Sequence, residues 1–205
     1  MEITAIEPRR KRLSLLYIDG EPAMKLDTFT LEAEGVRPGQ QITDEELHEL
    51  VEKSNTHRAG EKALYLLEYR SRTKKELTDR LREEVPAELA EETAQRMEDL
   101  GLVDDTAYAE EYARTLARRK QFSARRIRQE LAAKGIDKDT AEAAAVAAAG
   151  EPRQVIGEFL DRRFPTITEE KTRRRAVNTL QRMGYSYEDI RAVLRQRTEE
   201  DTDDD

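Results

Sequence analysis

Apolar and polar positions divide the chain near residue 42 into two parts with different periods. Before that point, "RLSLLYIDGEPAMKL" sets two short runs rich in Leu, Tyr and Ile on either side of Asp19-Gly20, which predicts a β-hairpin. A hairpin alone is marginal in water, so it must pair with another strand or pack on the helices that follow. We therefore expect residues 1–42 to form a small N-terminal extension containing a β-hairpin.

The remainder has helical spacing, and the spacing repeats. Thr43 and Glu46 have the Thr-x-x-Glu pattern of a capping box and predict the start of the first helix. Aligning "KKELTDRLREE", "ARRIRQELAAK" and "RRRAVNTLQRM" superposes two sets of apolar positions, about 50 residues apart. These positions are Leu77, Ile127 and Ala176, followed by Leu81, Leu131 and Leu180. A period of this length, filled with short helices, predicts stacked units that bury apolar faces against their neighbours.

The predicted fold class is all-α: a tandem array of three-helix repeats that forms a curved, elongated molecule, preceded by the hairpin-containing extension. We expect the helical repeat domain to cover residues 43–196, with units at about 61–120, 121–165 and 166–196. Residues 197–205 carry too much negative charge to pack, so they are expected to form a disordered acidic tail.

Polar residues at the predicted helix starts already have structural roles. Thr73 and Ser186 stand three positions before an acidic residue, as in capping boxes, and Ser123 is placed to cap the helix that follows it. In "LVDDTAYAEEYARTLARRK", acids come first and cations last, which is the distribution that the helix dipole favours. That stretch is first of all a well-terminated helix.

Composition restricts the classes of function. The chain is 37% apolar and 39% charged, and no apolar run approaches the roughly 18 residues of a membrane helix, so we expect a cytoplasmic protein without a membrane partner. With no cysteine and two histidines, His48 and His57, the sequence excludes thiolate zinc sites, disulfides and cysteine nucleophiles. No glycine-rich phosphate loop is present, and we expect no cofactor.

Charge is segregated along the chain despite a net value of −8. Between Tyr112 and Lys134, eight bases accompany a single acid, Glu130. Other cationic blocks lie at 9–12, 70–75 and 171–175. Any one block could be a solvated helix face that only aids solubility, but several at repeated positions indicate a common use.

The repeated cations begin helices, where the dipole opposes them, so another benefit is expected. Two uses are open: neutralising phosphates of a nucleic acid, or binding acidic grooves of a protein partner. Few aromatics accompany the bases, so stacking on single-stranded bases is not indicated. The candidate binding residues are Arg70, Arg72, Lys74, Lys75, Arg118, Arg119, Lys120, Arg125, Arg126, Arg128, Lys134, Arg173, Arg174 and Arg175.

Two catalytic alternatives are weaker. A metal site built from Asp104, Asp105, Glu110 and Glu111 would need carboxylates that converge from different elements, whereas consecutive helix residues point in different directions. The two histidines lie in a polar helical segment without a nearby nucleophile, so packing or surface roles are favoured. We expect neither a catalytic nor a metal site.

Three blocks resemble one family. "YRSRTKKELTDRL" is similar to the R-x-R-S-x-x-E-L-x-x-x-L stretch of the bacterial recombination regulator RecX family, with Thr73 in place of the usual serine. "GLVDDTAYAEEY" resembles its L-[IV]-[DN]-D-x-x-[FY]-A block, and "RRIRQELAAKGID" its R-I-x-x-E-L-x-x-K-G-[IV] block. The blocks occur in the family's order, and the resemblance extends over most of residues 63–194.

The resemblance implies a curved array of three-helix repeats that lies, as a monomer, in the groove of a RecA filament on single- or double-stranded DNA. It further implies a non-enzymatic regulator in DNA repair, recombination and the SOS response, which restrains RecA's ATPase, strand-exchange and coprotease activities. Two alternatives remain at this point: a DNA-binding regulator acting without RecA, and a metal-dependent nuclease that uses the acidic cluster.

Overall fold

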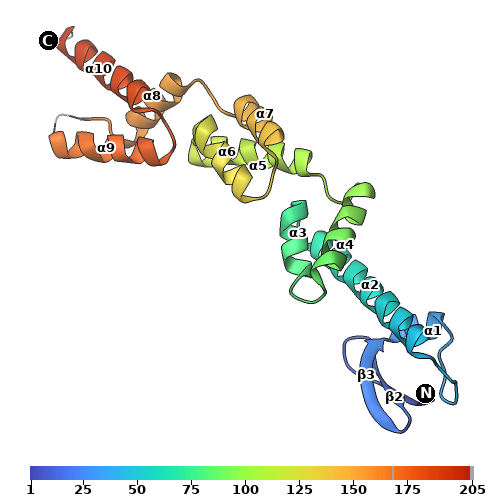
Figure 1. Ribbon diagram of the computed structural model, residues 1–205. Helices are drawn as coiled ribbons and strands as arrows, with labels where there is room; N and C mark the ends of the chain where they lie inside the picture. The colour runs from blue at the N-terminus through green and yellow to red at the C-terminus, as the bar shows by residue number, and fades with distance from the viewer. Residues whose placement is uncertain (168, 204–205) are drawn as a thin grey trace. The chain divides into compact units, whose positions relative to one another are not determined.

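The computed structural model describes residues 1–167 and 169–203. It divides into two compact units, the first covering Met1–Val103 and the second beginning at Asp104. Within the described residues the chain has ten helices and one three-stranded antiparallel sheet at the N-terminus (Figure 1). This confirms the predicted combination of a small β-containing extension and a helical repeat domain.

The sheet is an antiparallel meander. Strands β1 (Ile3–Pro8), β2 (Leu13–Ile18) and β3 (Glu21–Asp27) pair in the order β1-β2-β3. The predicted turn at Asp19-Gly20 joins β2 to β3, and both residues have positive φ, 51° and 88°, as a type I′ turn requires. The third strand that the hairpin needed is β1, which pairs with β2.

One side of the sheet is covered by α1 (Thr28–Ala33) and by the first half of α2 (Asp44–Tyr69). Helix α2 begins with the predicted capping box, in which Thr43 and Glu46 each bind the other's backbone N–H. Ser54 on α2 accepts a hydrogen bond from the backbone N–H of Asp27 at 2.8 Å. The sheet core is formed by Ile3, Leu16, Leu26, Leu31, Ile42 and Leu50.

The second half of α2 belongs to a different core. It packs with α3 (Lys74–Leu81) and α4 (Ala87–Asp99) to form the first repeat. The buried residues there are Ala63, Leu66, Leu77, Leu81, Ala90, Ala94, Met97 and Val103. Helix α2 is therefore shared between the sheet and the first repeat, without a linker between them.

The second unit contains two further three-helix groups. Helices α5 (Asp105–Lys120), α6 (Ala124–Ala133) and α7 (Lys138–Ala148) form the second repeat. Its core mixes Leu116, Ile127, Leu131 and Ile136 with alanines of α5 and α7, so its helices approach closely.

Helices α8 (Pro152–Arg163), α9 (Glu170–Arg182) and α10 (Tyr187–Asp203) form the third repeat. Helix α10 continues past the end expected near Gln196, so helix also covers much of the segment for which a disordered tail was expected; residues 204–205 lie outside the described residues. The second and third repeats begin at α5 and α8, each one helix before the starts expected at residues 121 and 166. The reason is that α5 and α8 share an apolar core with the basic helices that follow them.

The second and third repeats meet at the turn between α9 and α10. The backbone N–H of Ser123 donates to the carbonyl of Met183 at 3.0 Å, and Phe122 contributes to both cores. Gly184 in this turn has φ +96°, and a Cβ added there would lie 2.4 Å from Ser123 Oγ and 2.6 Å from Arg126 Cβ. Glycine is thus required by both backbone conformation and space.

We expect Gly184→Ala to lower the free energy of unfolding by about 2–4 kcal/mol, since left-handed backbone strain adds to a clash with α6. Gly101→Ala is the matched control: Gly101 also has positive φ but nothing lies within 4 Å of its added Cβ, so about 1–2 kcal/mol is expected. Urea unfolding followed by circular dichroism measures both, and equal losses would contradict the close contact at Gly184.

Candidate functional site

The candidate binding residues lie on the basic second helix of each repeat: on α3 in the first unit, and on α6, α9 and the end of α5 in the second unit. Each basic helix buries two apolar side chains one turn apart, at the aligned positions found in the sequence. Because these pairs fix which face points inward, the remaining positions of each helix are partly or fully exposed, apart from the buried Thr78 of α3. The N-caps of α3 and α6, Thr73 and Ser123, are 0% and 9% exposed and accept from Glu76 N–H and Arg126 N–H.

In the first repeat the candidate cations are bound by neighbouring acids. Arg70 contacts Glu76 at 2.8 Å, and Lys75 contacts Asp79 at 2.8 Å one turn along α3. Lys74 reaches from α3 to Glu98 on α4, also at 2.8 Å, so it joins two helices. These side chains contribute to the fold as well as to the surface charge.

Arg72 is a half-buried cation of the first repeat. Its Nε donates to the carbonyl of Leu66 at 3.2 Å, near the end of α2. Burial lowers the pKa of its guanidinium from the ordinary value, and the positive charges of Arg70 and Arg80 lower it further. Arg72 therefore holds the turn between α2 and α3.

Two arginines of α6 are also engaged inside the second repeat. Arg126 contacts Glu130 at 2.6 Å, and its guanidinium lies 5.5 Å from the centre of the Phe122 ring. Arg128 forms an ion pair with Glu142 on α7, so it joins α6 to α7. Lys134, at the end of α6, lies 5.9 Å from the centre of the Tyr112 ring.

A second group of cations is exposed and unpaired. Within the described part of the chain, Arg118, Arg119 and Arg125 form no hydrogen bond or ion pair through their side chains, and Lys120 lies only over Phe122, at 5.4 Å. They gather where α5 ends and α6 begins. The sequence did not separate these residues from Arg128, because Glu142 comes into reach of Arg128 only when α7 packs on α6. The partner of Arg126 is Glu130, four residues along the same helix.

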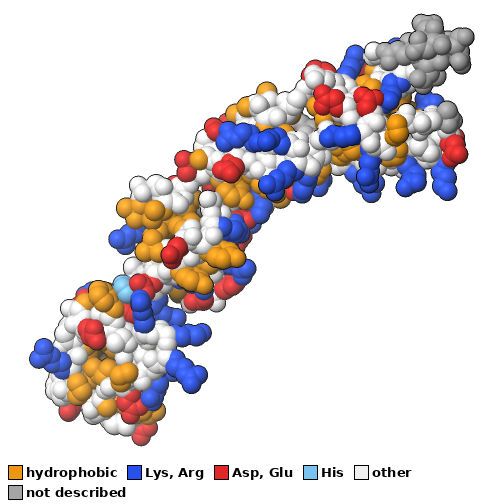
Figure 2. Space-filling model, turned by 180° about the vertical axis from the view of Figure 1, so that it is seen from behind, with side chains coloured by type: hydrophobic (Ala, Val, Ile, Leu, Met, Phe, Trp, Pro, Cys, Tyr) orange, Lys and Arg blue, Asp and Glu red, His pale blue; other side chains and the backbone are white. Residues whose placement is uncertain are grey.

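The third repeat carries its cations on α9. Arg174 pairs with Glu170 at 2.9 Å, whereas Arg173 and Arg175 have no side-chain partner among residues 1–167 and 169–203. Two exposed cations not included in the candidate set, Lys171 and Arg182, lie four residues before and seven after Arg175, on the same side of the helix. Figure 2 shows Lys and Arg side chains gathered along one edge of this part of the second unit.

Side chains of the third repeat hold the turn between α5 and α6 through hydrogen bonds. Gln121 ends α5 with φ 52°; its carbonyl accepts a hydrogen bond from the Tyr185 hydroxyl at 2.8 Å, and its side chain accepts from Arg162 at 2.7 Å. Burial raises the pKa of Tyr185 to about 12. These bonds hold the unpaired residues at the end of α5 beside those at the start of α6.

The acidic cluster of α5 acts as a helix terminus. Asp104 is the N-cap and accepts from the backbone N–H of Ala107 at 2.8 Å, while Glu110 pairs with Arg114 at 3.7 Å. Among the residues that the structure describes, no three or more acids or histidines lie together so that they could hold a metal ion.

The histidines pack near the sheet and on α2. His57 Nδ1 lies 3.0 Å from the buried carboxylate of Asp27, and its ring stacks on Phe29 with 4.6 Å between centres. His48 lies 3.3 Å from Glu52, one turn along α2. His57 thus packs against the end of β3 and against α1, and His48 contacts a neighbour on its own helix.

Comparison with known proteins gives a consistent result. Family models described as the first and the second three-helix domain of RecX match residues 59–97 and 104–144. "Regulatory protein RecX" of Bacillus velezensis is 29% identical over 99% of this chain and 80% of its own length. The protein of the same name from Levilactobacillus brevis is 34% identical over 65% of this chain, and the match spans about half, 51%, of that relative.

Solved structures are also similar. A crystal structure of regulatory protein RecX superposes with a TM-score of 0.65 over 94% of this chain and 98% of its own, and at 23% identity it supports the fold alone. The crystal structure of RecX from Lactobacillus salivarius gives a TM-score of 0.57 at 26% identity, over 69% of this chain and 96% of its own.

No helix in the described ranges combines the length and the hydropathy needed to span a membrane.

We expect the stability of the second unit to fall between about pH 10 and pH 12. The pKa of Tyr185 is raised to about 12 in the folded chain, so its stabilising effect is complete below about pH 10 and is lost as the pH rises towards 12. Urea midpoints measured across this range should fall more steeply for the wild-type chain than for Tyr185→Phe. Parallel curves would contradict the buried hydroxyl.

Asp104→Ala should lower the free energy of unfolding by about 1 kcal/mol, because it removes the N-cap of α5. Glu111→Ala, an exposed position on the same helix, is the control and should change it by less than about 0.5 kcal/mol. Thermal unfolding with and without Mg²⁺ tests the alternative: a metal site predicts Mg²⁺-dependent stabilisation and DNA cleavage that Asp104→Ala abolishes.

Proposed function

Because this chain belongs to the RecX family of regulatory proteins, we propose that it is a non-enzymatic regulator that binds RecA filaments on DNA and restrains them. It acts by occupying filament surface, and thereby lowers the ATPase, strand-exchange and coprotease activities of RecA. It works in the cytoplasm, in DNA repair and recombination and in the SOS response. The proposal requires no reacting group, cofactor or metal ion.

The observation that carries the proposal is that several exposed cations of the second unit have no side-chain partner among residues 1–167 and 169–203. A guanidinium without an acidic partner in its own chain breaks no ion pair when it binds a phosphate or carboxylate. Such charge-assisted contacts are among the stronger hydrogen bonds. Helix α9 begins at Glu170, so Arg173 and Arg175 are its fourth and sixth residues and do not lie at the helix start that the sequence predicted for them. Arg125 is the second residue of α6, where the helix dipole disfavours positive charge. An external anion would compensate for that cost.

The distribution of charge favours a composite partner over bare DNA. With a net charge of −8, the whole chain would be repelled by a phosphate backbone at long range. A filament that presents both DNA phosphate and protein surface suits a chain in which basic and acidic segments alternate. The acidic segment from Glu83 to Glu111 is the part that a basic protein surface would contact.

The proposal is tested by titrating the protein into RecA on single-stranded DNA and measuring ATP hydrolysis. The double variant Arg125→Glu/Arg175→Glu should need at least about tenfold more protein for half inhibition, equivalent to about 1.4 kcal/mol of binding free energy. Helicity should be unchanged, because neither side chain has a partner within the described residues.

The matched control is Lys138→Glu/Arg191→Glu, which changes the net charge equally at two exposed cations outside the basic helices. It should inhibit like the wild-type chain. Equal loss in both doubles would show that net charge, and not the basic helices, governs binding. No inhibition by the wild-type chain, together with duplex binding or Mg²⁺-dependent cleavage in the absence of RecA, would overturn the proposal.

A further inference from the structure

The same groove occurs in all three repeats, between the first and third helix. In the first repeat it lies between α2 and α4 and has a volume of about 820 Å³, against about 600 Å³ between α5 and α7 and about 490 Å³ between α8 and α10. The first two grooves are lined from matching positions: Thr56 and Leu64 in one correspond to Thr106 and Arg114 in the other. The groove is thus a property of the repeat.

The lining differs between repeats. In the third, an ion pair of 2.7 Å between Arg197 and Asp161 joins two of the lining residues, and in the second the floor is made of alanines. The groove of the first repeat alone among the three has large apolar walls: Leu64 is 50% and Leu100 61% exposed, beside the buried Met97. Leaving leucines this exposed costs hydration free energy unless another molecule covers them.

Gly60 gives a second and independent indication. It lines the groove from the middle of α2, and a Cβ added to it would have nothing within 4 Å. No packing within the first unit requires glycine there, although glycine within a helix costs roughly 0.5–1 kcal/mol relative to alanine. A missing side chain in an open groove lets an occupant approach the helix backbone closely.

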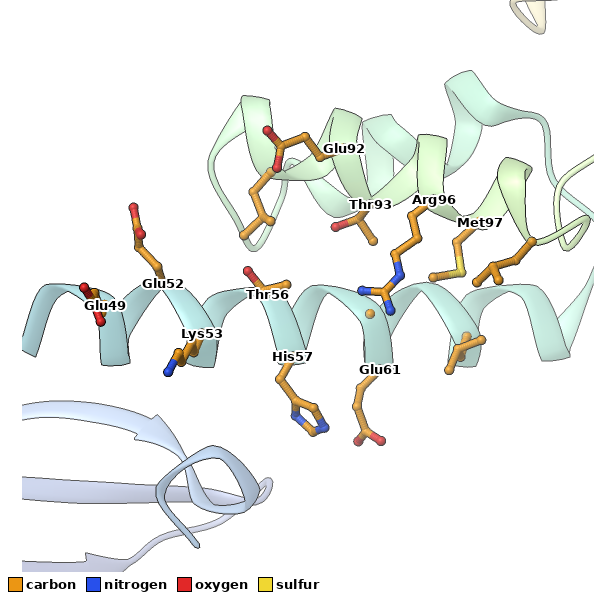
Figure 3. A pocket seen from close by; sticks show the side chains of 14 residues that line it. Glu49, Glu52, Lys53, Thr56, His57, Glu61, Glu92, Thr93, Arg96 and Met97 are labelled. Carbon is orange, nitrogen blue, oxygen red and sulfur yellow. The ribbon is translucent and has the colours of Figure 1, made fainter. Parts of the chain in front are cut away.

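The groove is acidic at one end, and at the other end Leu64, Met97 and Leu100 lie with Arg96 and Glu61. Figure 3 shows Glu49, Glu52 and Glu92 towards one end, and Thr93, Arg96 and Met97 extending from α4 towards α2 nearer the other. Glu49 and Glu92 form no ion pair within the part of the chain that the structure describes, whereas the lining Lys53 is neutralised by Glu34 at 2.7 Å. An occupant with positive charge at one end matches this pattern.

The walls of the groove also determine which backbone conformation an occupant can have. Both walls are helices, whose N–H and C=O groups are hydrogen-bonded within the helix. An extended peptide in the groove would therefore bury its own backbone N–H and C=O groups without hydrogen-bond partners. A helix satisfies its own backbone and presents apolar side chains at i, i+3, i+4 and i+7. From Glu49 to Leu64 the groove follows fifteen residue steps of α2, about 22 Å, which matches an occupant of about four turns.

We propose that the groove between α2 and α4 receives an amphipathic helix of a partner protein, with large apolar residues along one face and Lys or Arg at one end. This surface is separate from the basic helices of the second unit and does not depend on their role. Binding in the groove can be measured without RecA or DNA. The groove proposal and the proposed regulation of RecA can therefore fail independently of each other.

The probe is a fluorescein-labelled synthetic helix of about 18 residues, with leucines in that spacing and three lysines at one end. The full chain should bind it at least about tenfold more tightly than a copy with glutamates in place of the lysines, as measured by fluorescence anisotropy. Leu64→Asp and Leu100→Asp should each weaken binding about tenfold or more. Tyr65→Asp and Leu102→Asp, at exposed positions outside the groove, are the matched controls and should bind like the wild-type chain.

Gly60→Ala separates a binding role from a structural one. It should raise the unfolding temperature, because alanine favours helix, and yet weaken binding of the lysine-ended helix. The proposal is overturned if the chain binds neither peptide, or if groove and control variants bind alike. It is also overturned if the chain forms dimers that Leu64→Asp dissociates, because the occupant would then be a second copy.

Discussion

Burial of two apolar side chains on the second helix of each repeat is the constraint from which the rest of the helical domain follows. Leu77 and Leu81 in α3, and Ile127 and Leu131 in α6, are fully buried in helices of 8 and 10 residues. Helices so short are not stable alone, so the neighbouring helices and the buried N-caps must hold them. Since that one stripe faces inward, the cations between its members are directed to the surface.

Folding then sorts the cations by their neighbours. Lys74 and Arg128 find acids on the third helix of their own repeat and join helices together. Arg125 and Arg175 are placed where no acid of the described chain reaches them, so their charge remains available to a partner. Cations with and without an acidic partner in the described chain thus share the same helices, and only the positions of the acids distinguish them.

Much of the fold could be predicted from the sequence, because its signals are local. The capping box at Thr43, the turn at Asp19-Gly20 and the buried positions of the basic helices each depend on residues a few positions apart. The existence of α1, the grouping of helices into cores and the length of α10 depend on packing, which spacing alone does not determine. For the same reason the sequence could mark a basic block but could not tell Arg128, which has Glu142 beside it, from Arg125. The groove between α2 and α4 left no motif, since its walls come from residues some forty positions apart.

The sharing of α2 between the sheet and the first repeat affects how the extension can act. A domain joined through a flexible linker searches a volume, and the effective concentration at which it meets a second site falls as the linker lengthens. Here one continuous helix of 26 residues carries both the sheet core and the first repeat. A molecule bound by the sheet would therefore be presented to the first repeat at a set distance and orientation, with no linker entropy to lose.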